Sequence, residues 1–116
     1  MRREIEPFDE ATIISELSAL PAKDRAKLAA LLEFLEESQD GNPYPAQIDG
    51  YEHGLLRLRH VKAAYQGRAI FYVSESKQQF QKMVLLIVYK KETKKVPTAI
   101  LETARQRMDQ HKRKKK

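Results

Sequence analysis

The chain has 116 residues, a formal net charge of +6 and no cysteine. Its length suits one domain with a single modest core, and the lack of cysteine excludes disulfides, a thiolate nucleophile and a cysteine-based zinc site. No apolar run approaches the roughly 20 residues of a membrane span and the first residues lack the apolar stretch of a signal peptide, so we expect a cytoplasmic protein with no membrane partner.

The charges are distributed unevenly along the chain. Residues 1–53 contain 5 Lys and Arg and 12 Asp and Glu, a net charge of −7, whereas residues 54–116 contain 17 and 4, a net charge of +13. The last five residues supply five of these positive charges, and without them residues 54–111 still carry +8. A basic second half predicts a polyanionic partner, and affinity for that partner should depend strongly on salt.

Two helices are predicted in the first third of the chain. Asp9 can cap a helix whose apolar positions run to Leu20, and Pro21 interrupts this pattern. A second helix over residues 22–38 follows, with leucines at i, i+3, i+4 and i+7 from Leu28. Its charged residues are expected on the outer face: Lys23, Asp24, Lys27, Glu33 and Glu37. An acidic outer face would keep a nucleic acid on the opposite side of the molecule.

The period of the apolar residues changes from 3.6 to 2 in the second half. Residues 40–45 (DGNPYP) are rich in turn formers, and the stretch from there to Gly54 should be an irregular loop. Residues 55–61, 68–75 and 82–91 then predict three strands, with connections at 64–67 and 76–81. A final helix should begin near Pro97 and end in a frayed basic tail, HKRKKK.

These elements predict an α+β fold with a single domain over residues 1–111 and a basic tail over 112–116. An N-terminal helical hairpin would pack on a three- to four-stranded antiparallel sheet, with a further short strand near residues 4–8 and a C-terminal helix. One sheet face must pack on the helices, and the other can stay open. Because alternate strand residues point to opposite faces, Arg57 and Arg59 would lie on the open face, opposite Leu56 and Leu58.

Several segments resemble the RelE/HigB-type toxins of toxin–antitoxin systems, in their phage-derived HigB-like branch. Residues 54–59 (GLLRLR) resemble the G-L-x-E-L-R strand of that family, residues 67–72 (GRAIFY) its next strand, and residues 84–91 (VLLIVYKK) its V-L-L-x-x-F-x-K-K segment. A further group matches its K-K-T-x-K-x-P…E-x-A pattern: Thr93, Lys94, Pro97, Glu102 and Ala104. Arg57 replaces the family's strand glutamate, and Tyr89 replaces its phenylalanine.

The resemblance covers roughly residues 17–110 and has consequences for fold and function. It implies a compact RelE-like fold of the microbial-ribonuclease kind and a toxin that cleaves mRNA, in many relatives only within a translating ribosome. It also implies a cognate antitoxin, expected to be a helix-turn-helix protein, that covers the basic face.

RNA cleavage without a metal needs basic and proton-transferring side chains. The 2′-hydroxyl attacks the phosphate, so one group must take its proton, others must support the pentavalent phosphate, and one must protonate the leaving oxygen. The sequence shows no acidic cluster suited to Mg²⁺, so a metal-independent endoribonuclease without a cofactor is predicted. Arginine clamps phosphate through its planar donor fork. Arg59 and Arg68 are therefore candidates for catalysis, and Arg57 is a candidate for RNA binding.

Four lysines lie at the end of the third predicted strand and in the loop after it. Lys90 and Lys91 are assigned to catalysis, because a lysine among like charges can either stabilise the phosphate or act as a base. Lys94 and Lys95 lie further along the charged loop and are assigned to RNA binding. The alternative for all four is an ordinary charged loop exposed to solvent.

The tyrosines and histidines give less specific signals. Tyr72 and Tyr89 could stack on a base, although strand tyrosines more often belong to the core or its rim. His111 is a candidate RNA contact near the end of the chain, whereas His60 is expected to face the core. The three histidines, which include His53, do not have the spacing of metal ligands.

Two other functions are compatible with the same residues. A ParE-like toxin shares the fold but inhibits DNA gyrase without cutting RNA, since a fold does not fix a function. A non-enzymatic module could bind RNA or DNA with the basic sheet. A supercoiling assay identifies the first alternative, and salt-sensitive binding without any cleavage product identifies the second.

Overall fold

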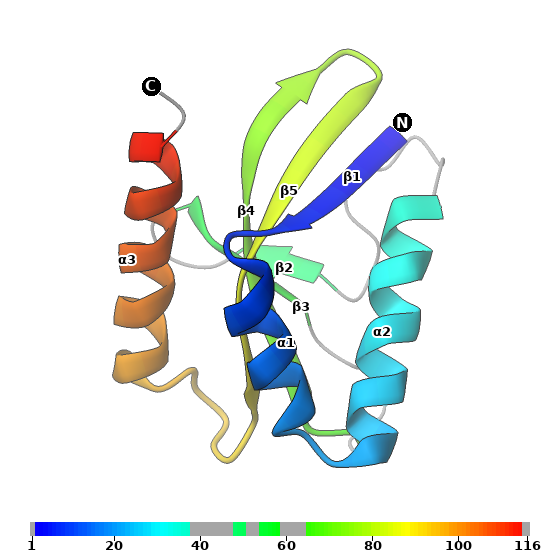
Figure 1. The fold of residues 1–116 in the computed structure, drawn as a ribbon, viewed down its shortest axis with the longest axis vertical. Coiled ribbons are helices and arrows are strands. Elements are labelled where there is room, and N and C mark those ends of the chain that lie inside the picture. Colours follow the sequence, from blue (N-terminus) through cyan, green and yellow to red (C-terminus); the bar gives the residue numbers. More distant parts are fainter. Residues whose placement is uncertain (1, 38–47, 51–53, 59–64, 115–116) are drawn as a thin grey trace.

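The computed structural model describes residues 2–37, 48–50, 54–58 and 65–114. Five strands form one sheet in the order β1-β5-β4-β3-β2, and helices lie on both of its faces (Figure 1). The elements in chain order are β1 (Arg2–Pro7), α1 (Glu10–Ser18), α2 (Ala22–Glu37), β2 (Ile48–Gly50), β3 (Leu56–Leu58), β4 (Gly67–Lys77), β5 (Phe80–Lys90) and α3 (Thr98–Lys114). The predicted α+β class is confirmed.

The sheet combines an antiparallel meander with a parallel edge strand. β3, β4 and β5 are consecutive and antiparallel, which confirms the predicted meander. β1 runs parallel to β5, from Arg2 opposite Phe80 to Pro7 opposite Leu85, so the prediction of a wholly antiparallel sheet is wrong at this edge. Two helices and three strands lie between β1 and β5 in the chain, and a connection of that length allows parallel pairing.

The second half differs from the prediction in two connections. The expected loop before Gly54 contains β2, where Ile48 is buried and pairs with Leu58. This prediction is wrong because a three-residue strand with one apolar side chain has no recognisable period. The predicted connection at 76–81 narrows to Gln78 and Gln79, since β4 and β5 stay paired up to Lys77 opposite Phe80.

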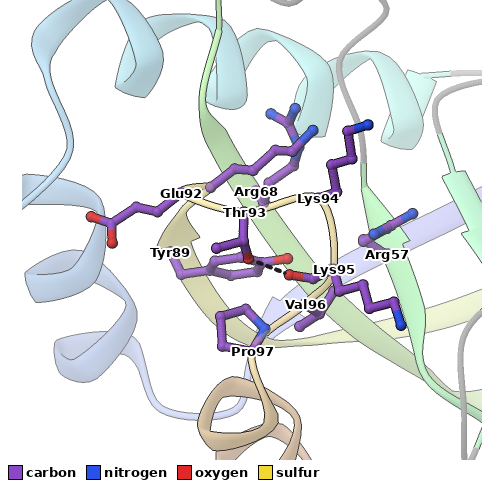
Figure 2. A pocket seen from close by; sticks show the side chains of 10 residues that line it. Arg57, Arg68, Tyr89, Glu92, Thr93, Lys94, Lys95, Val96 and Pro97 are labelled. Carbon is purple, nitrogen blue, oxygen red and sulfur yellow. Dashed lines mark hydrogen bonds between the residues drawn. The ribbon is translucent and has the colours of Figure 1, made fainter.

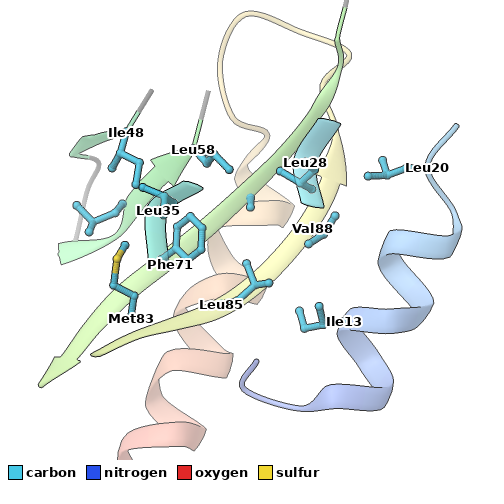
Figure 3. Packing of buried hydrophobic residues seen from close by; sticks show 12 residues of the cluster. Ile13, Leu20, Leu28, Leu35, Ile48, Leu58, Phe71, Met83, Leu85 and Val88 are labelled. Carbon is cyan, nitrogen blue, oxygen red and sulfur yellow. The ribbon is translucent and has the colours of Figure 1, made fainter. Parts of the chain in front are cut away.

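Helices cover both faces of the sheet. α1 and α2 pack on one face, with a core that includes Ile13, Leu28, Leu35, Leu58, Phe71 and Met83 (Figure 3). α3 packs on the other face, with a core that includes Ile70, Tyr72, Val84, Leu86, Ala104 and Met108. The prediction of an open sheet face is therefore wrong where α3 covers that face. The physical reason is that β5 carries apolar side chains on both of its sides. Among the described helices, none is long and apolar enough to span a membrane.

A bulge changes the side-chain alternation within β5. Ile70 pairs with Ile87 but Phe71 pairs with Leu85, so Leu86 is the extra residue. Leu86 and Ile87 both pack in the α3 core, whereas Leu85 and Val88 pack in the other core. A bulge bends its strand and leaves ladder groups without strand partners.

Side chains from α1 and α3 bond the backbone of β5 at this bulge. The Glu16 carboxylate accepts a hydrogen bond from Val88 N at 3.0 Å and one from the Arg107 guanidinium at 2.7 Å. Arg107 also donates to Leu86 O at 2.9 Å and lies 4.8 Å from the centre of the Phe8 ring. We call this the Glu16–Arg107 clamp. It completes the edge of β5 beyond Pro7, where β1 ends.

The last helix is longer than predicted. The prediction of a frayed tail is wrong for residues 111–114, because α3 continues to Lys114. His111 is held there by hydrogen bonds to Tyr72 and Glu6. Basic residues in the last turn also interact favourably with the negative end of the helix dipole.

The cap of α1 behaves as predicted and has a consequence at acid pH. The Asp9 carboxylate accepts hydrogen bonds from the backbone and hydroxyl of Thr12, and these bonds lower its pKa from the ordinary 3.8. A carboxylate with a lowered pKa stabilises the fold above pH 3.8 and loses that contribution as the pH falls through the lower folded value.

We therefore expect Asp9→Asn, which keeps a capping oxygen, to make the stability of the fold depend less on pH in the acid range. Thermal unfolding of both proteins between pH 7 and pH 2 measures this effect. Asp109→Asn, at an exposed position on α3, is the control and should leave the curve unchanged. Parallel curves for Asp9→Asn and the unchanged chain would contradict the prediction.

Candidate functional site

A basic hollow lies where β3, β4, β5 and the loop before α3 meet (Figure 2). Its polar and aromatic lining includes Arg57, Arg68, Tyr89, Lys91, Lys94 and Lys95. Its volume is about 80 Å³, well below the roughly 300–1,000 Å³ of pockets that enclose a small molecule. The hollow therefore suits one charged group of a larger ligand. A shallower hollow beside it shares Arg68, Lys91 and Lys94 and adds Tyr65.

The end of β5 and the loop after it set the positions of the lysines. Alternate strand residues point to opposite faces, so Tyr89 and Lys91 line the hollow while Lys90 between them does not. The Thr93 hydroxyl donates to Lys95 O at 2.7 Å and tightens the loop (Figure 2). Figure 2 also shows the Glu92 carboxylate on the side away from Arg57 and Lys95. The loop thus contributes Lys91, Lys94 and Lys95 to the lining of the hollow, and Glu92 lies on it as well.

Arg68 forms the buried side of the hollow. Only 6% of the residue is exposed, and one guanidinium nitrogen donates to Tyr65 O at 3.0 Å and to Gly67 O at 2.9 Å. These bonds fix the guanidinium against the backbone that enters β4. Arg68 therefore adds a fixed positive charge to the hollow and also shapes the backbone that enters β4.

A buried aspartate on α2 holds the same backbone from the other side. Asp24 is 2% exposed, and its carboxylate accepts a hydrogen bond from Gln66 N at 2.8 Å. Lys91 N donates to Gln66 O at 2.7 Å, so Gln66 is held between α2 and the end of β5. Gly67 fits here because a Cβ would lie 3.3 Å from Leu20 Cδ1. The predicted outward position of Asp24 is wrong, and its place four residues before Leu28, on the apolar stripe, was the available signal.

Asp24→Ala should weaken both the fold and the hollow. The substitution removes the charged acceptor of the part-buried Gln66 N–H bond, and loss of a hydrogen bond to a charged group costs roughly 1–3 kcal/mol. Urea unfolding should show that loss, whereas Asp24→Asn, which keeps an acceptor oxygen, should lose less. Equal stability of the alanine variant and the unchanged chain would show that the Gln66 bond does not hold this segment.

Tyr72 and His111 form a second cluster at the other end of α3. The Tyr72 hydroxyl bonds to His111 Nδ1. His111 Nε2 lies 3.3 Å from one oxygen of the Glu6 carboxylate, and Lys82 Nζ lies 3.3 Å from the other. Burial raises the pKa of Tyr72, and the charge of Glu6 adds to this effect. The protonated phenol can therefore donate to Nδ1, and Nε2 faces the Glu6 carboxylate. The cluster ties the last turns of α3 to β1 and β4.

The two clusters are well separated. Arg68 and Tyr72 are four residues apart on β4, about 13 Å, and Pro97 and His111 are fourteen residues apart, about 21 Å along the helix. Of the predicted site residues, six surround the basic hollow: Arg57, Arg68, Tyr89, Lys91, Lys94 and Lys95. Lys90, Tyr72 and His111 lie elsewhere, and Arg59 falls outside the described residues. His53 and His60, which were not predicted as site residues, also fall outside them.

The charge of the site comes from its Arg and Lys side chains. Within the described ranges, no three His, Asp or Glu side chains gather in a way that could hold a metal ion. The residues that sequence reasoning missed are Thr93, which shapes the loop, and Asp24, which holds Gln66. Both act on the backbone of the site.

Comparison with known proteins assigns the family. The model of the family described as "Phage derived protein Gp49-like" matches residues 15–109, which include all the elements that build the basic hollow. The chain therefore belongs to the phage-derived Gp49-like proteins, a RelE-like family of the toxin type. A search of curated proteins gave no match. The HigB-like branch stays a prediction.

Proposed function

We propose that this protein is the toxin of a type II toxin–antitoxin pair and cleaves mRNA at the basic hollow. The observation that supports this function is the meeting of cationic side chains from β3, β4 and the loop after β5 around one small cavity. These segments are distant in sequence, so the arrangement is more specific than a basic composition. Membership of the Gp49-like family supports the toxin class.

The chemistry follows from the groups that line the hollow. A backbone phosphate would lie among Arg57, Lys91 and Lys94, whose charges stabilise the extra negative charge of the pentavalent phosphate. The 2′-oxygen bonds to phosphorus as its proton is removed, and the 5′-oxygen leaves as it gains a proton. Tyr89, as its phenolate, would take the 2′-proton, and the Lys91 ammonium in the same hollow would give a proton to the leaving 5′-oxygen, so we assign proton transfer to these two. Arg59 and Lys90 stay candidates for catalysis.

Induced expression in bacteria tests the function as a whole. We expect growth arrest and new transcript 5′ ends inside translated regions, which would also indicate cleavage on the ribosome. Arrest with intact transcripts would overturn the nuclease and favour gyrase inhibition. Absence of arrest, with salt-sensitive RNA binding by the purified protein, would favour a non-enzymatic module.

The proposed partners are mRNA, the ribosome and a cognate antitoxin of the helix-turn-helix kind. An acidic segment of the antitoxin placed over Arg57, Lys94 and Lys95 would neutralise the charges that RNA needs. Co-expression of the neighbouring gene should therefore restore growth, and the purified pair should lose salt-sensitive RNA binding. Recovery of growth with unchanged RNA binding would place the antitoxin away from the hollow.

A further inference from the structure

An apolar cleft opens on the face of the sheet opposite the basic hollow. α1 and α2 diverge from the turn at Pro21, and β1 crosses between their open ends (Figure 1). The cleft has a volume of about 310 Å³. Its lining is mainly apolar and comes from α1, α2, β1 and β5: Ile5, Pro7, Ile13, Ala29, Leu32 and Leu85. Two carboxylates, Glu33 and Glu36, complete it. We call this the helical cleft.

The helical cleft presents apolar surface to solvent instead of closing over it. Ile13 and Leu85 are buried at its floor, but Ile5 and Leu32 are only partly buried and Ala29 is exposed. Ile14 and Phe34, on the same two helices, are 54% and 51% exposed. Scattered exposed apolar residues are common, whereas an apolar concavity with a polar rim marks an interaction surface.

The backbone of β1 favours a helix over a strand as the occupant. Ile5 N already donates to the Glu36 carboxylate at 3.1 Å, so Ile5 turns its backbone groups away from β5. By alternation, Pro7 turns the same way and has no N–H to donate. The outer edge of β1 thus offers few donors to an added strand. An amphipathic helix needs only an apolar groove of this kind.

The charges of the helical cleft define the partner further. Its polar lining is acidic, since Glu33 and Glu36 lie on it and, among the residues that the structure describes, neither Lys nor Arg does. A second copy of this chain fits poorly, because α3, its basic helix, buries Ala104 and Met108 on its own sheet. The outer side of α3 carries Glu102 and Asp109 beside its basic residues. We infer that the helical cleft is the docking site for an amphipathic helix of another protein, with basic residues beside its apolar stripe.

This inference is independent of the cleavage proposed for the basic hollow. The sheet separates the two surfaces, so a docked helix and a bound RNA can occupy the protein together. Because the two surfaces lie on opposite faces, a partner helix in the helical cleft could contact the basic hollow only through a second segment of the same partner.

Two designed peptides test the docking site on the full chain labelled at its Ile and Leu methyl groups. Both are helices of about 18 residues, five turns, with the same leucine stripe; lysines flank it in one and glutamates in the other. We expect NMR shifts at Ile5, Ile13, Leu32 and Leu85 with the lysine peptide, and affinity about tenfold weaker for the glutamate peptide at the same methyls. Equal affinities, or no shift at these methyls, would overturn the inference.

Adjacent alanines on α2 provide a matched pair of variants. Ala29 lines the helical cleft, whereas Ala30 is exposed beside it and does not. Ala29→Arg should fill the cleft and lower affinity for the lysine peptide by about tenfold or more, while Ala30→Arg, with the same chemistry, should change it less than about twofold. Arginine favours helix, so both variants should fold, which circular dichroism checks. Similar losses in both would show that charge alone attracts the peptide, and the docking site would be rejected.

Discussion

Replacing Arg57 and Lys91 together by glutamine is expected to slow RNA cleavage by at least about 100-fold, the effect typical of removing preorganised charge stabilisation from a transition state. The two side chains come from β3 and from the end of β5, and they meet at the basic hollow. Glutamine keeps most of each side chain's length and its polarity, so the fold should persist. The initial rate of transcript cleavage in a translation reaction measures the effect.

A control with equal loss of charge separates the hollow from general basicity. Lys23 and Arg25 are exposed on α2, outside the lining of the hollow, and their joint change to glutamine should lower the rate only slightly. Equal loss in both double variants would mean that net charge, rather than geometry, binds the RNA. Full activity of the Arg57 and Lys91 variant would move the active centre elsewhere, with Arg59 and Lys90 as the next candidates.

Arg107→Met is expected to destabilise the fold by about 2–3 kcal/mol. Removing one partner of a buried ion pair costs roughly 3–5 kcal/mol, and a smaller value applies here because the Arg107 and Glu16 side chains keep 18% and 21% of their surface exposed. The change also removes the donor to Leu86 O at the bulge. Urea unfolding measures the loss.

The double variant tests whether the clamp acts as a unit. Glu16→Gln with Arg107→Met should cost less than the sum of the single changes, because the second change no longer leaves a charge without its partner. The exposed pair of Glu75 and Lys77, 3.2 Å apart, provides the control: Lys77→Met should cost less than about 0.5 kcal/mol. Additive losses, or a loss at Lys77 as large as at Arg107, would contradict the clamp.

Periodicity predicted the elements that carry many apolar residues. The spacing of apolar side chains predicts the two N-terminal helices, because it repeats over one or two helical turns. It also predicts the meander of β3, β4 and β5, because it alternates over several strand residues. The parallel pairing of β1 and the short β2 do not follow, because both depend on partners distant in sequence. The second covered face was foreseeable in part, since β5 is apolar at every position from Met83 to Val88.

The candidate site was predicted in its composition more than in its geometry. Its motifs pointed to Arg57, Arg68 and the lysines after β5, and the fold brings six of the ten predicted residues together. Strand alternation, which separates Lys90 from Lys91, was available in the sequence. The roles of Asp24 and Glu16 were not available, because each carboxylate bonds backbone more than forty residues away.

The Glu16–Arg107 clamp also bears on how the protein is made. Its two side chains are 91 residues apart, and both bond the same stretch of β5. During synthesis from the N-terminus, β5 can pair with β4 and β1 and Glu16 can bond Val88 N, but Leu86 O at the bulge lacks its donor until residue 107 has emerged. Contacts of such long range form late and slow the folding of a domain. A nascent chain that stops short of α3 therefore has its hairpin complete and its sheet edge open, which leaves the unfinished protein more exposed to proteases than the finished one.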